Sequence, residues 1–299
     1  MRIAVTGAGG FVGRRVVRAL AERGHEPMPI RRDATADSGS PYNRADLAGA
    51  AAVIHAGARV HVMRDREPDP LAAFRRANRD ATLALAEQAA AAGVGRFVFV
   101  STIHVNGTST TGRPPYWADD PPAPVGPYAR SKFEAEEGLR QSAKRTGMEV
   151  SVVRPVLVCG PGAGGNLARL AAVCRRGVPL PLASVANRRS LLHVDDLADL
   201  LVLAAEGAGA GRTLLAADPE ALSTPALIRA ICRAQGRAAR LFPCPVDLLR
   251  LGGRLTGMSA TLEQLAGSLE ADPTQTMAAT GWRPRRGVGA AIEDFVRGG

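Results

Sequence analysis

The amino-acid sequence predicts an α/β protein in which a doubly wound parallel sheet is followed by a smaller, mostly helical part. Three observations predict this class. In the first half of the chain, short β-rich runs alternate with longer segments whose apolar residues recur at helical spacing. A glycine-rich turn joins the first run to the first helical segment, and the alternation ends near residue 160. Strands separated by such helices pair in parallel through right-handed crossovers, so helices cover both faces of the sheet.

The first three elements are a strand, a helix and a second strand. Residues 2–6 (RIAVT) form a short apolar run. Residues 11–23, after the glycine turn, carry apolar residues at helical spacing. Residues 26–30 (EPMPI) are expected to form the second strand, but two prolines remove backbone donors from it, so its length is less well defined.

The next five elements continue the alternation. Residues 52–55 (AVIH) form an apolar strand, and the alanine-rich residues 69–92 form a long helix that a glycine closes. Residues 96–101 (RFVFVS) are rich in β-forming residues, residues 131–145 have a helical pattern, and residues 149–154 (EVSVVR) form a fifth strand. Together with the first three, these elements make the βαβ units of a parallel sheet.

The pattern changes after residue 159. Residues 160–187 and 218–299 contain short helical patterns, glycine-rich turns and proline-rich stretches, which predict a second, smaller domain. Residues 1–159 and 188–217 are assigned to the sheet domain, because one late return to the sheet is expected around residues 191–205. The two domains are therefore predicted to be interleaved along the chain.

Composition excludes several classes of protein. With 299 residues, 46% of them hydrophobic and 22% charged, the chain can bury a globular core. Its four cysteines lie far apart without a CxxC pair, so neither a metal site nor a disulfide framework is predicted. No apolar run reaches the roughly 20 residues that span a bilayer, and the first residues lack the pattern of a signal peptide. A soluble, cytoplasmic protein without a membrane partner is expected.

The formal net charge of +10 raises the question of a nucleic-acid partner. Nearly all the cations are arginines spread along the chain, and only 4% of the residues are aromatic, which leaves few side chains on which bases could stack. A general bias toward arginine and alanine explains this composition better than a polyanion-binding surface does. No nucleic-acid partner is therefore predicted, whereas a small anionic ligand is compatible with the charge.

The glycine turn TGAGGFVG follows the first strand and opens the first helix. Glycines let the backbone approach a pyrophosphate closely, and the start of a helix offers unpaired N–H groups and the positive end of the helix dipole. In this context the turn predicts dinucleotide binding. The residues expected to contact the dinucleotide here are Gly7, Gly10, Phe11, Val12 and Gly13.

The GxxGxxG spacing of this turn resembles that of the extended short-chain dehydrogenase/reductases, the nucleotide-sugar epimerases, dehydratases and reductases. The resemblance covers essentially the whole chain. It implies that the sheet domain is a Rossmann-type NAD(P)-binding domain and that the smaller domain binds a nucleotide sugar. It also implies a homodimer formed through paired helices.

The end of the second strand bears on the choice between NAD and NADP. An acid there binds the adenosine ribose hydroxyls, whereas an arginine accommodates a 2′-phosphate. In the similar UDP-galactose 4-epimerases the acid falls where this chain has Arg31, and Arg32 follows it. NADP(H) is therefore favoured over NAD(H), although Asp33 could still reach the ribose. Asp46 and Leu47 resemble the pair that lies against the adenine in this family.

Tyr128 and Lys132 (YARSK) are the candidate catalytic pair. A spacing of four residues places both side chains on one helix face, and lysine is rare in this arginine-rich chain. A phenol has a pKa of about 10. A neighbouring ammonium together with the cationic nicotinamide ring lowers that pKa, because the positive charges stabilise the phenolate. Tyr128 is then expected to act as general acid on a carbonyl or as base on an alcohol, while Lys132 also holds the nicotinamide ribose.

A third catalytic residue is expected at the end of the fourth strand. Matched to the family through the residues VNG, Thr102 corresponds to the Ser/Thr that hydrogen-bonds the reacting oxygen, and Ser101 corresponds to a cofactor contact. The similar sugar 4,6-dehydratases have acids where Ile103 and His104 stand here, so dehydration is disfavoured, and His104 is expected at the edge of the substrate. Asn106 replaces a tyrosine that the epimerases usually have, which weakens a simple epimerase assignment.

Further cofactor contacts follow from the resemblance alone. Ala56, Gly57 and Ala58 stand in the turn after the third strand, which passes the cofactor in this family. Asn78 falls on the long helix and is assigned as a cofactor contact. An exposed asparagine without a role in binding is nearly as well supported at this position. Pro155 ends the fifth strand in a stretch similar to the family's RPxxVYGP.

The resemblance also implies the substrate and the reaction. Asn166 and Arg189 match positions that hold the nucleotide diphosphate, and a guanidinium suits bidentate contact with phosphate. The leading hypothesis is an NADP(H)-dependent reductase of a UDP-4-keto sugar. A preference for NADP favours net reduction, because an epimerase must retain its cofactor and return the hydride to the sugar. The alternative is a UDP-sugar 4-epimerase with tightly held NAD. Reduction of a small non-nucleotide carbonyl, and a non-catalytic dinucleotide sensor, are further alternatives.

Overall fold

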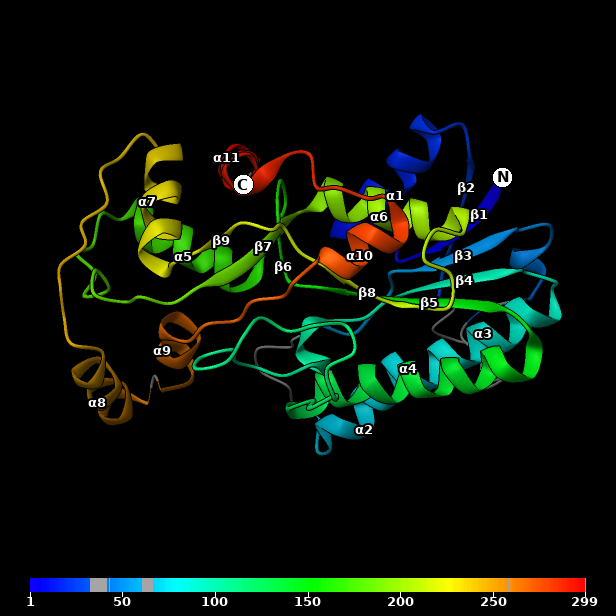
Figure 1. Ribbon diagram of the computed structural model, residues 1–299, viewed down its shortest axis with the longest axis horizontal. Helices are drawn as coiled ribbons and strands as arrows, with labels where there is room; N and C mark the ends of the chain where they lie inside the picture. The colour runs from blue at the N-terminus through cyan, green and yellow to red at the C-terminus, as the bar shows by residue number, and fades with distance from the viewer. Residues whose placement is uncertain (33–41, 43, 61–66, 258, 299) are drawn as a thin grey trace.

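The computed structural model describes residues 1–32, 42, 44–60, 67–257 and 259–298, so Asp33 lies outside the described residues. Within them, six parallel strands form the main sheet in the order β2-β1-β3-β4-β5-β8 (Figure 1). These strands are β1 (Arg2–Thr6), β2 (Glu26–Ile30), β3 (Ala52–His55), β4 (Arg96–Val100), β5 (Glu149–Pro155) and β8 (Thr213–Ala216). The predicted parallel sheet is therefore confirmed.

Helices cover both faces of this sheet, as the sequence predicts (Figure 1). One face carries α1 (Phe11–Glu22), α6 (Val194–Glu206) and α10 (Thr274–Thr280). The other face carries α2 (Pro70–Phe74), the π-helical turn η2 (Arg75–Asp80), α3 (Ala81–Ala91) and α4 (Gly126–Thr146). Of two short 3-10 turns, η1 (Arg44–Leu47) leads into the amino end of β3, and η3 (Ile103–Val105) follows the carboxyl end of β4.

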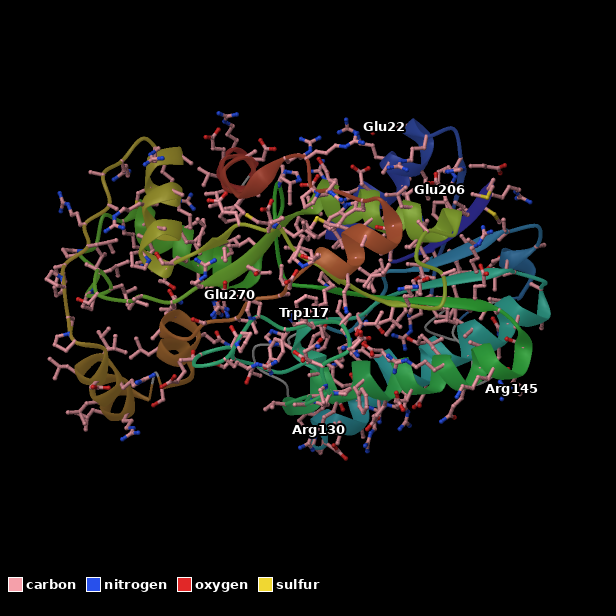
Figure 2. The ribbon with its side chains drawn as sticks, in the orientation of Figure 1. Glu22, Trp117, Arg130, Arg145, Glu206 and Glu270 are labelled. Atoms are coloured by element: carbon pink, nitrogen blue, oxygen red, sulfur yellow. The ribbon has the colours of Figure 1, made fainter. Side chains whose placement is uncertain are left out.

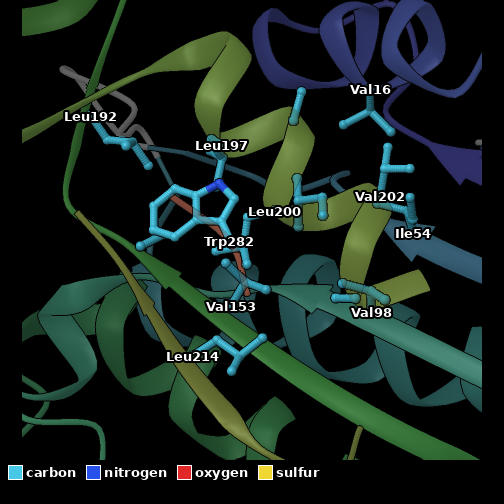
Figure 3. Close-up of a cluster of buried hydrophobic side chains, with 14 of the residues drawn as sticks. Val16, Ile54, Val98, Val153, Leu192, Leu197, Leu200, Val202, Leu214 and Trp282 are labelled. Atoms are coloured by element: carbon cyan, nitrogen blue, oxygen red, sulfur yellow. The ribbon is translucent and has the colours of Figure 1, made fainter. Parts of the chain in front are cut away.

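Each face of the sheet has its own apolar core. On the face of α1 and α6, Trp282 packs among leucines and valines from the strands and from α6 (Figure 3). The indole nitrogen of Trp282 donates a hydrogen bond to the carbonyl oxygen of Asp196 at 3.0 Å, so this large side chain is buried without an unsatisfied donor. The opposite core is formed with α3 and α4 and includes Phe97 and Phe99 of β4.

A smaller, mostly helical cap stands at one end of the main sheet (Figure 1). Its strands β6 (Leu157–Cys159), β7 (Arg189–His193) and β9 (Ala221–Leu222) form a second sheet in the order β6-β7-β9. Its helices are α5 (Gly165–Arg175), α7 (Thr224–Ala234), α8 (Val246–Thr256), α9 (Ser259–Ala266) and α11 (Gly287–Arg297). Trp117 and Glu270 lie at the junction of the two parts, beside a bridge between Tyr116 and Ala271 (Figure 2). None of the described helices is long and apolar enough to cross a membrane.

Two predicted elements are wrong in detail. The late return to the main sheet is β8 at residues 213–216, not the segment at 191–205, whose strand β7 joins the small sheet and whose remainder is helix α6. The side chain of His193 accepts a hydrogen bond from the nitrogen of Asp195 and so caps this helix. In addition, α4 begins at Gly126 rather than at residue 131, because a proline in the first turn of a helix has no N–H that needs a partner.

Candidate active site

The glycine turn between β1 and α1 lies against the turn that follows β3. Gly7 has φ +67°, and a Cβ on it would lie 2.8 Å from the backbone nitrogen of Gly57. A Cβ on Gly13 would overlap the carbonyl oxygen of Gly7. Neither position has space for a side chain, so both glycines are required for the turn to close as it does.

The first turn of α1 offers backbone N–H groups to a ligand. The helix begins at Phe11, and its capping residue is Gly10, which has no side chain that could bond to the first N–H groups. The first N–H groups of a helix have no partner within it, so those of Phe11 and Val12 are available. None of the described residues of this turn is acidic, which leaves the positive end of the helix open to an anion. The turn therefore fits a dinucleotide diphosphate, and it lies where α/β sheets bind ligands, between strands whose helices leave in opposite directions.

Gly13→Ala tests this turn. Because the new Cβ overlaps the carbonyl oxygen of Gly7, we expect the affinity for a dinucleotide to fall roughly tenfold or more and the thermal stability to fall with it. Gly9→Ala is the matched control, because a Cβ at Gly9 meets no heavy atom within 4 Å. Fluorescence titration with NADPH and NADH measures the affinity. Equal affinities for the two variants would show that the turn tolerates a side chain at residue 13.

A chain of hydrogen bonds through His55 holds the turn after β3. The hydroxyl of Thr82 donates to the carbonyl oxygen of Asn78 at 2.6 Å, so it accepts from Nε2 of His55 at 2.9 Å. Nδ1 of His55 then accepts the Thr6 hydroxyl proton at 2.5 Å, and the Thr6 oxygen accepts from the nitrogen of Gly57 at 3.4 Å. The imidazole is thus neutral and links β1, β3 and the helix that follows.

His55 makes the fold sensitive to acid. Burial, followed by the charges of Lys132 and Arg32, lowers the pKa of His55 from 6.5 to about 3. Between these values the unfolded chain binds a proton that the folded chain excludes, so stability falls as the pH drops from about 6.5 toward 3, by about 1.4 kcal/mol per pH unit. His55→Gln is expected to reduce this slope in urea unfolding curves measured at several pH values. An unchanged slope would assign the acid sensitivity to other groups.

The residues predicted to select the cofactor lie near the same strand ends. Arg31 and Arg32 follow β2 directly and are exposed. Asp46 is exposed, but Leu47 is wholly buried in the core, so the structure places only the first of this pair where a ligand can reach it. Because β2 pairs with β1, both arginines lie beside the strand end that carries the glycine turn, and the charge of Arg32 contributes to lowering the pKa of His55.

Asn78 is fully buried, which rules out the alternative of an exposed asparagine. Its Oδ1 accepts from the nitrogen of Arg59 at 2.7 Å, and its Nδ2 donates to the carbonyl oxygen of Arg59 at 3.0 Å and to the hydroxyl of Ser131 at 3.2 Å. Ser131 in turn donates to the carbonyl oxygen of Tyr128 at 2.8 Å. Asn78 therefore joins the segment after Ala56–Ala58 to the first turn of α4.

Tyr128 and Lys132 lie one helical turn apart on α4. Nζ of Lys132 donates to the carbonyl oxygen of Val100 at 2.8 Å and lies 4.5 Å from the centre of the Phe99 ring. The Tyr128 ring meets the Phe74 ring edge-on, with 6.0 Å between the ring centres. The structure therefore brings Lys132 to the carboxyl end of β4 and places Tyr128 one helical turn before it, against α2.

Burial shifts the pKa values of both members of the pair. Burial raises the pKa of Tyr128 to about 12 and lowers the pKa of Lys132 to about 7, while the charge of Glu136 acts on Lys132 in the opposite direction. In the chain by itself, burial thus acts on the Tyr128 pKa in the direction opposite to the predicted effect of the ammonium and a bound nicotinamide ring, and the lowering in the complex stays a prediction. The protonated phenol can donate a hydrogen bond to a carbonyl oxygen, and transfer of its proton becomes easier as its pKa falls toward neutrality.

Thr102 and Ser101 follow β4 but have different partners. The Thr102 hydroxyl accepts a hydrogen bond from the nitrogen of His104 at 3.3 Å, which leaves its own proton for another acceptor. The Ser101 hydroxyl donates to the Glu136 carboxylate at 2.5 Å and is directed into the protein. His104 is half-buried one residue into η3. Of the residues predicted at this strand end, Thr102 is the one whose hydroxyl is available to a substrate oxygen.

A buried ion pair beneath this strand end was not predicted from the sequence. The side chains of Arg154 and Glu136 are 2% and 0% exposed, and Nη2 of Arg154 lies 2.5 Å from the Glu136 carboxylate. Nη1 of Arg154 donates to Oδ1 of Asn106 at 3.0 Å, so the residue that replaces the epimerase tyrosine is bound in this network. A signal did exist, because Glu136 stands four residues after Lys132 on the same helix face.

The two residues predicted to hold the substrate diphosphate meet at one residue of α9. Nδ2 of Asn166 donates to Oε1 of Gln264 at 2.9 Å, and Nη1 of Arg189 donates to the carbonyl oxygens of Gln264 at 2.6 Å and of Gly267 at 3.1 Å. Burial lowers the pKa of Arg189. Pro155 lies at the carboxyl end of β5, where that strand pairs with β8. Asn166 and Arg189 are thus together in the cap, and part of the Arg189 guanidinium is already bonded.

A parallel sheet of this Rossmann type, with an open glycine turn between strands whose helices leave in opposite directions, is typical of enzymes that bind a dinucleotide. Residues 3–216 match the family model described as the NAD dependent epimerase/dehydratase family. The chain belongs to this family, within the extended short-chain dehydrogenase/reductases, and its cofactor is an NAD(P) dinucleotide. The family and the fold predicted from the sequence are therefore confirmed.

Individual proteins agree with this assignment. A UDP-glucose 4-epimerase from Vibrio cholerae is 35% identical over 296 residues, which cover 94% of this chain and 90% of that protein. The solved structure of RMD from Pseudomonas aeruginosa complexed with NADPH has a TM-score of 0.78 at 22% identity and covers 100% of this chain and 99% of that one. A UDP-glucose 4-epimerase from Thermus thermophilus complexed with NAD has a TM-score of 0.76 at 24% identity, with 100% and 98% covered.

Proposed function

We propose that the protein is an NADP(H)-dependent oxidoreductase that reduces the C4 carbonyl of a UDP-4-keto sugar. The observation that carries this proposal is the bond from Lys132 of α4 to the carbonyl oxygen of Val100 at the end of β4, with Tyr128 one helical turn before Lys132 and Thr102 two residues after Val100. The similarity to a UDP-glucose 4-epimerase at 35% identity supports both the nucleotide sugar and the C4 position.

Three side chains have distinct roles in this reaction. Tyr128 donates its proton to the carbonyl oxygen, and Thr102 donates a hydrogen bond to the same oxygen. Lys132 binds the nicotinamide ribose, and its amine is held at the end of β4 by Val100. The bound dinucleotide supplies the hydride to C4. The product is an alcohol, with the proton from Tyr128 on its oxygen and the hydride on its carbon.

Arg31 is proposed to select NADP(H) by pairing with the 2′-phosphate. We expect Arg31→Asp to weaken NADPH binding about tenfold or more and to change NADH binding much less, because the variant loses a charge-assisted contact that only NADPH makes. Arg212→Asp is the control, since it removes an exposed arginine at the opposite, amino end of β8. Fluorescence titration of each variant with NADPH and with NADH measures the two affinities. Wild-type protein that binds NADH as tightly as NADPH would overturn the proposed preference.

A 4-epimerase with tightly held NAD is the second candidate, and the Vibrio cholerae relative favours it. The two reactions are separated by incubating a UDP-hexose with the protein and no added reductant. Sustained interconversion of C4 epimers would establish the epimerase. Stoichiometric oxidation of NADPH by a UDP-4-keto sugar would establish the reductase.

The cap residues Asn166 and Arg189 are proposed to hold the diphosphate of the substrate. UDP should then compete with the sugar substrate for the cofactor-loaded protein. A reaction that UDP does not inhibit would favour a small non-nucleotide carbonyl. The proposal keeps the interleaved division of the chain, but β6 and β7, which the predicted bounds 1–159 and 188–217 put in the sheet domain, belong to the sheet of the cap. It also includes a homodimer formed through α4, which light scattering tests.

A further inference from the structure

One end of the cap carries an excess of unpaired positive charge. Residues 224–257 include six arginines and a single acidic residue, Asp247. Of these arginines, Arg250 pairs with Asp247 and with Glu263 of α9. The other five are exposed and form no ion pair with any residue that the structure describes; they are Arg229, Arg233, Arg237, Arg240 and Arg254.

Three of these arginines line one open cleft. Arg229 and Arg233 lie one turn apart on α7, and Arg237 follows the end of that helix. Together with Gly236 and two alanines they line a cleft of about 400 Å³. Three guanidinium groups around a shallow cleft without a carboxylate attract an anion such as a phosphate group.

Helix α8, the next helix along the chain, exposes a row of leucines. Leu248, Leu251 and Leu255 are 58%, 52% and 82% exposed, and their spacing of three and four residues places them on one face. The opposite face is packed, because Leu249 is buried and Gly253 lies against Leu262 of α9. Exposed apolar rows of this kind mark interaction surfaces rather than ordinary solvent-exposed helices.

The arginines and the leucines share one end of the molecule. The segment at 235–245 runs from α7 to α8 along the edge of the cap, at the left of Figure 1, and Phe242 within it is 46% exposed. Side chains stand outward along this segment and along α8 (Figure 2). The main sheet and the residues proposed for catalysis lie away from this end.

We propose that this end of the cap, residues 224–257, docks on an anionic membrane surface. The leucines of α8 insert among acyl chains, while Arg254 of the same helix and the arginines of the cleft on α7 bind lipid phosphates. Apolar side chains together with arginines are the combination that interfacial helices use. A nucleic acid fits less well, because leucines offer no stacking surface to bases. The predicted absence of a membrane partner rested on the lack of a spanning segment, and docking on a surface requires no such segment.

The test is flotation of the full-length protein with lipid vesicles. We expect binding to vesicles that contain phosphatidylglycerol, loss of most binding in vesicles of phosphatidylcholine alone, and weakening at high salt. The double variant Leu251→Ser with Leu255→Ser and the triple variant Arg229→Gln, Arg233→Gln and Arg237→Gln should each bind roughly tenfold more weakly or worse. Leu157→Ser is the matched control, because Leu157 is a 39% exposed leucine of β6, which pairs with β7 and not with residues 224–257.

Several outcomes would overturn the proposal. These are absence of binding to anionic vesicles, equal binding by the leucine double variant, and binding of inorganic phosphate without binding of vesicles. Light scattering that shows a dimer dissociated by the leucine substitutions would instead assign this face to a second copy of the chain. Dinucleotide binding by each variant shows that it is folded, and this readout is independent of the membrane result.

Discussion

Replacing Tyr128 with phenylalanine is expected to lower turnover by about two to four orders of magnitude and to leave dinucleotide binding nearly unchanged. The variant keeps the ring that packs edge-on against Phe74, so the start of α4 should stay in place. It removes only the hydroxyl. Because burial holds the Tyr128 pKa at about 12, the lost group is a protonated donor, and we expect reduction of a carbonyl to suffer directly.

Steady-state kinetics and cofactor titration of the same preparation test this expectation. Tyr116→Phe is the matched control, because it removes a tyrosine hydroxyl whose partner is the carbonyl oxygen of Ser109 in a loop of the protein. That variant should keep its turnover within a few-fold. If Tyr128→Phe lost less than about tenfold in turnover, another group would have to supply the proton, and His104 next to Thr102 would be the first to examine.

The strands of the main sheet were predictable because their local pattern leaves few alternatives. The bounds predicted for β1, β2 and β3 are those of the structure, since each is a short run closed on both sides by turn residues. The prediction that residues 191–205 return to the main sheet is wrong for a different reason. The apolar residues of this segment extend through strand β7 and helix α6, which are both almost wholly buried. No polar face therefore marks the change from strand to helix.

The candidate site was predictable where it depends on spacing within one segment. The turn at Gly7–Gly13 and the pair Tyr128 and Lys132 each lie on a single stretch of chain, so sequence spacing determines their geometry. The partners that orient them come from other elements. His55 joins Thr6 to Thr82, and the Arg154 guanidinium meets Glu136 only because β5 lies beside β4 under α4. The raised pKa of Tyr128 depends on burial, which no local pattern specifies.

The second large effect is expected from Arg154→Met, which should destabilise the fold by about 3–5 kcal/mol. The substitution leaves the Glu136 carboxylate buried without its main cation and leaves Oδ1 of Asn106 without its donor. Urea unfolding followed by circular dichroism measures the change, with the midpoint compared to that of the wild-type protein. Turnover should fall as well, because Ser101, next to Thr102, bonds to the same carboxylate.

Arg140→Met is the matched control for this ion pair. Arg140 contacts the same carboxylate at 3.1 Å, but its side chain is 39% exposed and water can replace it, so its loss should change stability by about 1 kcal/mol or less. The double variant Glu136→Gln with Arg154→Met removes both charges and should recover much of the loss, since an unpaired buried charge is the main penalty. If the loss of unfolding free energy in the double variant equalled the sum of the losses in the two single variants, the interaction between the two charges would contribute nothing to stability. The packing of the Arg154 side chain beneath β4 would then account for the whole effect.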